Sequence, residues 1–317
     1  MKGPLTKPDA DNGLIARMFL AFAVAYFFSA LLRAVAATLA PAFSAEFGLK
    51  SADLGLLAGA YFLGFSVLQL PLGSALDRVG PKRVILGLLL LAVLGCAAFA
   101  AAPGLGGLIG ARVLIGMGVS ACLMAPLTAF RTRCSSGLQL RLNSWMLMTG
   151  SLGMVASTLP VQWLLPLYGW RGLFWALAAL LLLAMALIVW WVPADAAPAS
   201  HADQPSRPGY RHILVHPLFV RSAPLGFFNY GGLIAIQALW AGPWLTRVAG
   251  WTPAEAAGGL FSINLCMLAA FWLWGWVMPG LSRRGVDVHR IMQAGMPLSL
   301  VVLAAILLNP HPAGAVA

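Results

Sequence analysis

Charged side chains are scarce in this sequence. Asp, Glu, Lys and Arg make up 9% of its 317 residues, whereas hydrophobic residues make up 61%. Because a soluble domain carries roughly 25% charged residues, the composition excludes an ordinary soluble protein and favours an integral membrane protein. The nine acidic residues and five histidines lie in loops or at the ends of apolar runs. No run therefore holds the carboxylate or histidine that a proton relay normally uses.

Catalytic and metal-binding signatures are also missing. The four cysteines are scattered singly, without the spacing of metal ligands or of a disulfide framework; they are Cys96, Cys122, Cys134 and Cys266. The chain contains no phosphate-binding loop, no HExxH and no GxSxG, which argues against ATP-driven transport and hydrolytic chemistry. We expect no enzyme activity, no metal and no cofactor.

Long apolar runs dominate what remains. Each is near or above the roughly 20 residues that cross the hydrocarbon core as a helix, and a spanning backbone must satisfy its own hydrogen bonds. The nine runs are 14–42, 54–76, 84–102, 104–130, 143–166, 172–192, 222–245, 256–279 and 291–309. The sequence predicts an all-α integral membrane protein with about nine transmembrane helices.

The net charge of +11 indicates topology rather than nucleic-acid binding. With the N-terminus placed in the cytoplasm, basic residues gather in the cytoplasmic segments, and only Lys50, Arg171 and Arg247 fall in the external ones. This is the positive-inside distribution, and it makes the lipid bilayer the partner of these charges. Arginine outnumbers lysine sixteen to four, a bias that, with abundant Ala, Gly and Leu, is typical of GC-rich bacteria. We expect a multi-pass protein of a bacterial plasma membrane.

The chain divides at a Pro- and Ala-rich stretch. Residues 193–221 read as a cytoplasmic linker, between an N-terminal half at 1–192 with six helices and a partial C-terminal half at 222–317 with three. The two sides are weakly similar, because Gly48–Asp53 and Gly250–Glu255 open corresponding helices in the same way. Parallel repeats of this kind occur in some transporters.

A charged turn separates the second and third runs. Its residues are Gly73, Asp77, Arg78, Gly80, Lys82 and Arg83. We expect Asp77 to pair with a basic residue or cap a helix, and the two glycines to allow close approach and positive φ. The alternative is a generic basic loop, which would not explain Asp77 or the glycine spacing.

This turn resembles the signature loop of the major facilitator superfamily, G-x-x-x-D-R-x-G-R/P-K/R-R. The segment from Arg112 to Gly118, with Gly116, is similar to that family's fourth-helix motif, R-x-x-x-G-x-G; the alternative is an arginine that snorkels to the outer surface. The resemblance implies a bundle of twelve helices in two halves, a gate at the charged turn, and secondary transport by alternating access. Since only nine runs are present, the resemblance also implies a C-terminally truncated chain.

Arg33, in the first run, is the main candidate for substrate binding. Tyr26 lies on the same face, and a buried guanidinium can hold a carboxylate or phosphate through two hydrogen bonds. This run and Glu46–Leu49 resemble organophosphate:phosphate antiporters and related anion porters. Those proteins carry a second arginine in helix seven, where this chain has Ala235–Gln237. One cation favours a monoanion; the alternative is a structural arginine at the outer interface.

The seventh run supplies further candidates for the central cavity, namely Asn229, Tyr230, Gln237 and Trp240. Asn229 and Gln237 are eight residues apart and share a helix face, and Trp240 follows; the alternative is that the polar pair joins helices. Trp170 and Arg171 are expected to anchor the sixth run at the headgroups. We predict a monomeric transporter of a small organic anion. The alternatives are a drug or amphiphile exporter, and a receptor-like or fragmentary protein that does not transport.

Overall fold

The computed structural model describes residues 11–195, 214–236, 240–283, 295 and 297–305. Helices are the regular structure of these residues, and they contain no strand. The helices are α1 (Asn12–Phe47), α2 (Ser51–Arg78), α3 (Pro81–Ala100), α4 (Leu105–Val119), α5 (Met124–Arg133), α6 (Ser136–Ala156), α7 (Leu159–Trp191), α9 (Pro217–Ala235), α10 (Ala241–Arg247) and α11 (Pro253–Arg283).

These helices follow the predicted apolar runs, with interruptions that hydropathy does not reveal. The fourth run is split into α4 and α5 by a turn at 120–123, although Leu105–Arg133 is long and apolar enough to be one span. The fifth run, 143–166, is divided between α6 and α7 by a turn at 157–158. In α7 the helical path then breaks at Gly169, whose φ is 62°. The ninth run is described only in part, as helix at 297–305. Six stretches in the described part of the chain are long and apolar enough to cross a membrane.

The two loops that the sequence predicts to be similar fold alike. Gly48 ends α1 with φ 62°, and the Asp53 carboxylate then accepts a hydrogen bond of 2.8 Å from the Lys50 amide at the start of α2. Before α11, Gly250 has φ 73° and the Glu255 carboxylate accepts from the Thr252 amide at 2.8 Å. In both loops an acid at the third helical position satisfies an amide that the helix leaves free.

Glycines bring α4 against its neighbours. A Cβ on Gly116 would stand 2.1 Å from the Tyr61 carbonyl oxygen of α2, and a Cβ on Gly118 would stand 2.2 Å from the Ala92 amide nitrogen of α3. Such distances are possible only without a side chain, so α4 is packed backbone to backbone between α2 and α3. The packing role that the motif implies for these two glycines is confirmed.

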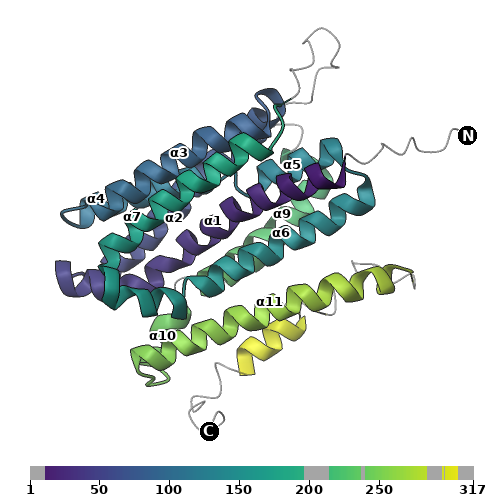
Figure 1. The fold of residues 1–317 in the computed structure, drawn as a ribbon. Coiled ribbons are helices and arrows are strands. Elements are labelled where there is room, and N and C mark those ends of the chain that lie inside the picture. The colour runs from purple at the N-terminus through teal and green to yellow at the C-terminus, as the bar shows by residue number, and fades with distance from the viewer. Residues whose placement is uncertain (1–10, 196–213, 237–239, 284–294, 296, 306–317) are drawn as a thin grey trace, which may run out of the picture.

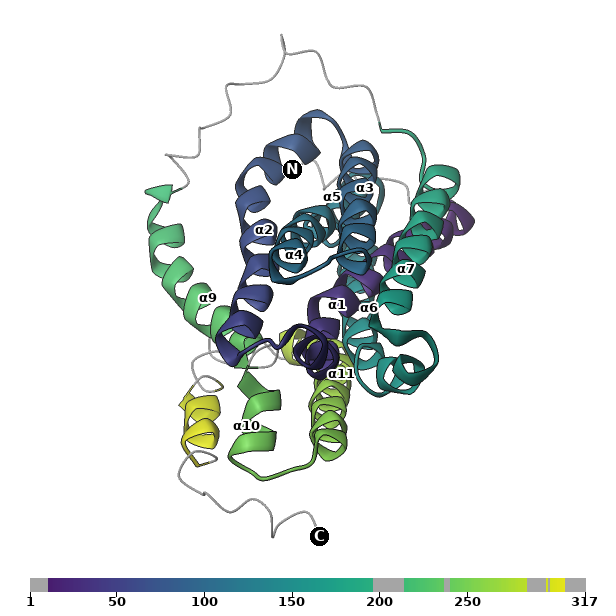
Figure 2. The ribbon, with the colours of Figure 1, turned by 90° about the vertical axis from the view of Figure 1, so that its left-hand side faces the viewer.

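The other helices surround this core. On α6, a Cβ at Gly153 would stand 2.2 Å from the Phe27 carbonyl oxygen of α1, so α1 and α6 also meet at close range. Figure 1 shows α1 to α7 as a bundle of long helices lying side by side. In Figure 2, viewed after a quarter turn, α10 and α11 lie below α1 and α6, and α9 lies at the left, beside α2. The described helices thus form two groups, α1 to α7 and α9 to α11, and α1 faces the second group.

Candidate functional site

Arg33 lines a pocket between these two groups of helices. It lies on α1 and is half-buried, and its guanidinium carbon stands 5.8 Å from the ring centre of Phe65. Among the described residues it pairs with no carboxylate. The pocket is lined by α1, the α6–α7 region, α9 and α11, through Arg33, Ala34, Ala37, Thr38, Met154, Ser157, Thr158, Ile234, Leu260 and Asn264.

The polar groups of this pocket, other than Arg33, are neutral. The Thr38 hydroxyl donates to the Ser157 carbonyl at 2.7 Å, and the Thr158 hydroxyl donates to the Val155 carbonyl at 2.6 Å. Asn264 is buried on α11 and donates to the Leu260 carbonyl at 2.9 Å. A pocket that combines one cation with neutral polar groups and apolar side chains suits a small anion. Sequence reasoning missed Thr38, Ser157 and Asn264, since single polar residues in apolar runs carry no spacing signal.

Three tyrosines stand near Arg33. They are Tyr26 on α1, Tyr61 on α2 and Tyr230 on α9. Tyr26 was a sequence candidate, and Gly150 makes room for it, because a Cβ there would stand 2.5 Å from the Tyr26 ring. Tyr230 was named among the residues of the seventh run, whereas Tyr61 was not predicted. The only signal for Tyr61 is that it is the one tyrosine of its apolar run.

The candidates from the seventh run are only partly described. The backbone of Asn229 belongs to α9, but its side chain and the whole of Gln237 lie outside the described residues. Trp240 directly precedes α10, is 66% exposed, and is not among the residues that line the pocket. The presence of these three residues in the binding site stays a prediction.

Arg112 is buried inside the bundle, with 1% of its surface exposed. Its Nη1 donates to the Leu32 carbonyl of α1 at 2.8 Å, and its Nε lies 3.5 Å from the Leu57 carbonyl of α2. The guanidinium carbon stands 4.7 Å from the centre of the Tyr61 ring. The alternative of an arginine snorkelling to the surface is therefore wrong, and Arg112 joins α4 to α1 and α2.

The charged turn between α2 and α3 also makes specific contacts. Asp77 pairs with Arg131 of α5 at 3.4 Å, as the sequence predicts. Arg78 is the exposed last residue of α2. Gly80 has φ 99°, so its predicted positive φ is confirmed. The same prediction for Gly73 is wrong, because Gly73 lies within α2 and a Cβ there would have open space.

Asp195, just after α7, caps the start of α3. Its carboxylate accepts from the Lys82 and Arg83 amides, each at 3.1 Å, where the positive end of the helix dipole favours an anion. The Lys82 ammonium in turn donates to the carbonyl oxygens of Val189 at 2.8 Å and Val192 at 2.5 Å. Asp195 was not predicted, since 112 residues separate it from Arg83.

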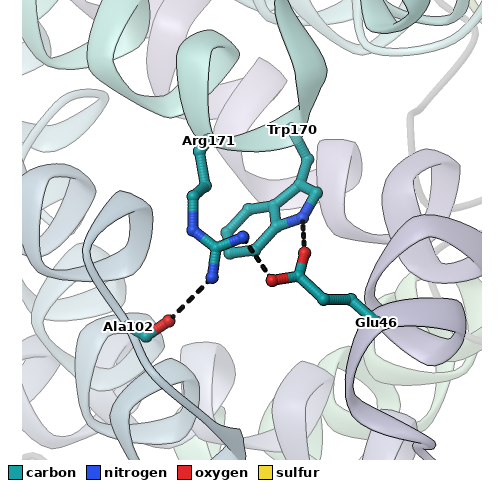
Figure 3. A network of polar contacts seen from close by, with 4 residues as sticks. All are labelled: Glu46, Ala102, Trp170 and Arg171. Atoms are coloured by element: carbon teal, nitrogen blue, oxygen red, sulfur yellow. Dashed lines mark hydrogen bonds and ion pairs between the residues drawn. The ribbon is translucent and has the colours of Figure 1, made fainter.

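A second polar network lies at the other end of the α2 helix. Figure 3 shows the Glu46 carboxylate accepting from the Trp170 indole at 2.7 Å and pairing with Arg171, which also donates to the Ala102 carbonyl at 3.2 Å. Trp170 is 5% exposed and stacks edge-on against Phe43 and other aromatic rings. The expected anchor at the headgroups is therefore wrong for Trp170, which joins α7 to α1 within the protein.

At this same end the two groups of helices touch. The Arg247 guanidinium, at the end of α10, donates to the Ser51 hydroxyl at the start of α2 at 2.7 Å. The residues are 196 positions apart. This contact closes one end of the molecule across the boundary on which the Arg33 pocket lies.

Known proteins with similar sequences include transporters named for aromatic acids. The chain is 24% identical to the 4-hydroxybenzoate transporter PcaK of Acinetobacter baylyi, over 86% of this chain and 66% of that protein. It is 25% identical to the 3-(3-hydroxy-phenyl)propionate transporter of Escherichia coli, over 95% of this chain and 73% of that protein. The chain thus spans about two thirds of the length of the first of these relatives.

Solved structures and the family comparison agree on the fold. A bacterial homologue of the human lysosomal transporter Spinster, inward-facing and unoccupied, has a TM-score of 0.65 at 18% identity, over 87% of this chain and 64% of that one. The Escherichia coli fucose:proton symporter has a TM-score of 0.62 at 19% identity, over 82% and 70%. The Major Facilitator Superfamily profile matches residues 22–317. The chain is therefore a multi-pass membrane protein of the Major Facilitator Superfamily, a family of transporters and not of enzymes.

Proposed function

We propose that this chain belongs to a secondary active transporter that carries a small organic monoanion by alternating access. The observation that carries the proposal is Arg33, which lines a pocket between two groups of helices and pairs with no carboxylate among the described residues. An arginine within a span is costly and normally faces a cavity or a partner. A carboxylate from the solute supplies that partner, through charge-assisted hydrogen bonds.

The substrate class that we propose is an aromatic carboxylate. The relatives are named for 4-hydroxybenzoate and 3-(3-hydroxy-phenyl)propionate, which each combine one carboxylate with a phenol ring. Phe65 and three tyrosines stand near Arg33, and such aromatic surroundings favour an aromatic carboxylate over an aliphatic one. In this proposal Arg33 takes the role that the likeness to organophosphate:phosphate antiporters implies, but for a carboxylate, because the position of their second arginine holds no basic residue here.

The orientation and organisation are part of the proposal. We place the N-terminus and residues 193–221 in the cytoplasm of a bacterium, the halves 1–192 and 222–317 on either side of the pocket, and a monomer in the plasma membrane. Contact between Arg247 and Ser51 then closes the external end, and the pocket is reached from the cytoplasm. The inward-facing state of one structural neighbour supports this assignment.

Uptake of a solute panel by reconstituted protein tests the proposal. Proteoliposomes holding the chain are given labelled 4-hydroxybenzoate, its neutral amide, a dicarboxylate, a phosphate ester and a lipophilic cation. We expect uptake of the monocarboxylate alone, reduced more than about tenfold by Arg33→Gln. Transport of the lipophilic cation, unaffected by Arg33→Gln, would show an exporter instead. Binding without movement of any solute would favour the receptor-like alternative.

A further inference from the structure

Tyr61 has a hydroxyl group whose proton meets no acceptor within the described residues. Its side chain, on α2, is fully buried, and the one polar side chain within hydrogen-bonding reach of the hydroxyl among the described residues is that of Arg33. Leaving a buried hydroxyl unpaired costs about 1–3 kcal/mol, so nearly all such groups in folded proteins find a partner. An unpaired group of this kind beside a binding pocket points to a partner that arrives with the ligand.

The surroundings of this hydroxyl identify the kind of partner. The Arg33 guanidinium lies within hydrogen-bonding reach of it, but a guanidinium has only donors. Even a tightened contact between the two would leave the phenol proton without an acceptor. A carboxylate is an acceptor with two oxygens, so it can take one hydrogen bond from Arg33 and another from Tyr61.

Arg112 holds Tyr61 in place from the other side. Its guanidinium carbon lies 4.7 Å from the centre of the Tyr61 ring, within the range of a cation–π contact. Its hydrogen bond to Leu32 fixes the α1 backbone at the residue before Arg33. Gly116, one turn after Arg112, lets the α4 backbone touch the carbonyl of Tyr61 itself. One helix, α4, thus fixes both Tyr61 and the backbone that carries Arg33.

We propose that the Tyr61 hydroxyl is the second donor to the carboxylate that Arg33 binds, and that Arg112 is the residue that positions Tyr61. This inference rests on the proposed function. Tyr61 is fully buried beside Arg33 and does not line the pocket, so in this proposal its hydroxyl is reached only by the carboxylate bound at Arg33, and the ring of the solute stays away from it. Removal of the Tyr61 hydroxyl should therefore lower the affinity for benzoate and for 4-hydroxybenzoate by the same factor.

Equilibrium binding to the purified full chain tests this. Tyr61→Phe removes one oxygen and keeps the ring on Arg112, so the variant should fold as the parent does. We expect its affinity for benzoate and for 4-hydroxybenzoate to fall by about tenfold, with no change for 4-hydroxybenzamide, which carries no charge. Tyr168→Phe is the matched control, because Tyr168 is an exposed phenol outside the site, and it should change neither affinity.

Arg112 is tested through its dependence on Tyr61. Arg112→Lys should weaken benzoate binding in the parent chain but add little in the Tyr61→Phe background, because the lost contact acts through the phenol. Additive losses would assign Arg112 a general packing role and overturn its part. If Arg112→Lys does not fold, Gly116→Ala, which disturbs the same α2–α4 contact, takes its place and is combined with Tyr61→Phe in the same double-mutant cycle.

The outcomes separate this inference from the proposed function. If the parent chain binds no carboxylate, both are overturned. If the parent binds benzoate and Arg33→Gln abolishes binding while Tyr61→Phe leaves it unchanged, the proposed function stands and the role of Tyr61 is refuted. Selective loss of carboxylate binding in Tyr61→Phe supports the inference.

Discussion

Arg131 of α5 reaches the Asp77 carboxylate at the end of α2, with 3.4 Å between Nη2 and Oδ1. Both side chains are partly exposed, at 64% and 36%, and such pairs contribute at most about 1 kcal/mol to stability. The pair is too weak to hold the fold, and we propose that its role is to bias a gate. It links α2 to α5 at the end of the molecule opposite to the Arg247–Ser51 contact.

Asp77→Asn should slow transport without unfolding the protein. Removing up to about 1 kcal/mol from one gate state shifts the balance of states by up to about fivefold. Initial uptake rates in proteoliposomes measure the effect, and the thermal transition in detergent should stay where it is. Asp77→Glu, which keeps the charge, is the matched control. Equal uptake rates for the parent, Asp77→Asn and Asp77→Glu would show that the charge of Asp77 has no role in transport.

Gly80→Ala should destabilise the turn between α2 and α3. The φ of Gly80 is 99°, which strains any other residue by about 1–3 kcal/mol, and the added Cβ would stand 2.3 Å from the Asp195 carboxyl carbon. We expect a lower unfolding temperature for Gly80→Ala. Gly73→Ala, in open space within α2, should match or exceed the parent. A stable Gly80→Ala variant would mean that this turn differs from the one described.

Alanine at the α4 glycines should disturb the bundle. Gly116→Ala and Gly118→Ala each place a methyl group into a neighbouring backbone, and overpacking of this kind costs about 1–3 kcal/mol. Unfolding by denaturant in mixed micelles measures the loss. Gly110→Ala is the control on the same helix, since nothing lies within 4 Å of the position that its Cβ would take. Similar stability in all three variants would contradict the backbone contacts of α4.

The two ends of α2 should lie on opposite sides of the membrane. In a cysteine-free background, an impermeant thiol reagent added to intact cells should label Lys50→Cys and spare Val79→Cys, because the proposal places residue 50 outside. Permeabilised cells should label both variants, which shows that each cysteine can react. The reverse pattern would invert every side assigned to the loops.

The sequence was most informative where a feature is local. Apolar runs located the helices, because crossing hydrocarbon demands length and hydrophobicity. Asp77, Gly80 and Gly116 were predicted from the motifs that contain them, and each makes a contact or adopts a conformation that the motif implies. Gly73 belongs to the same motif yet has space around it. Its place in the motif therefore did not mean that a glycine is required at that position.

The features that were missed depend on distant parts of the chain. Asp195 caps α3 although 113 residues separate it from Lys82, and Trp170 is buried by Phe43 and Phe99, which come from two other helices. Tyr61 becomes significant only when α1 and α4 place Arg33 and Arg112 on either side of it. Spacing along one helix contains no information about such partners, because tertiary packing determines them.

The most direct test of the central claim is the affinity of the purified chain for 4-hydroxybenzoate when Arg33 is changed. Arg33→Gln removes the charge and should weaken binding by about 2–5 kcal/mol, which is more than tenfold. Arg33→Lys keeps the charge but lacks the planar fork, so its affinity should lie between those of the parent and Arg33→Gln. Arg17→Gln, an exposed arginine on the same helix, should bind as the parent does. If Arg33→Gln binds the carboxylate as tightly as the parent, Arg33 is a structural residue and the account of an anion transporter built around it is wrong.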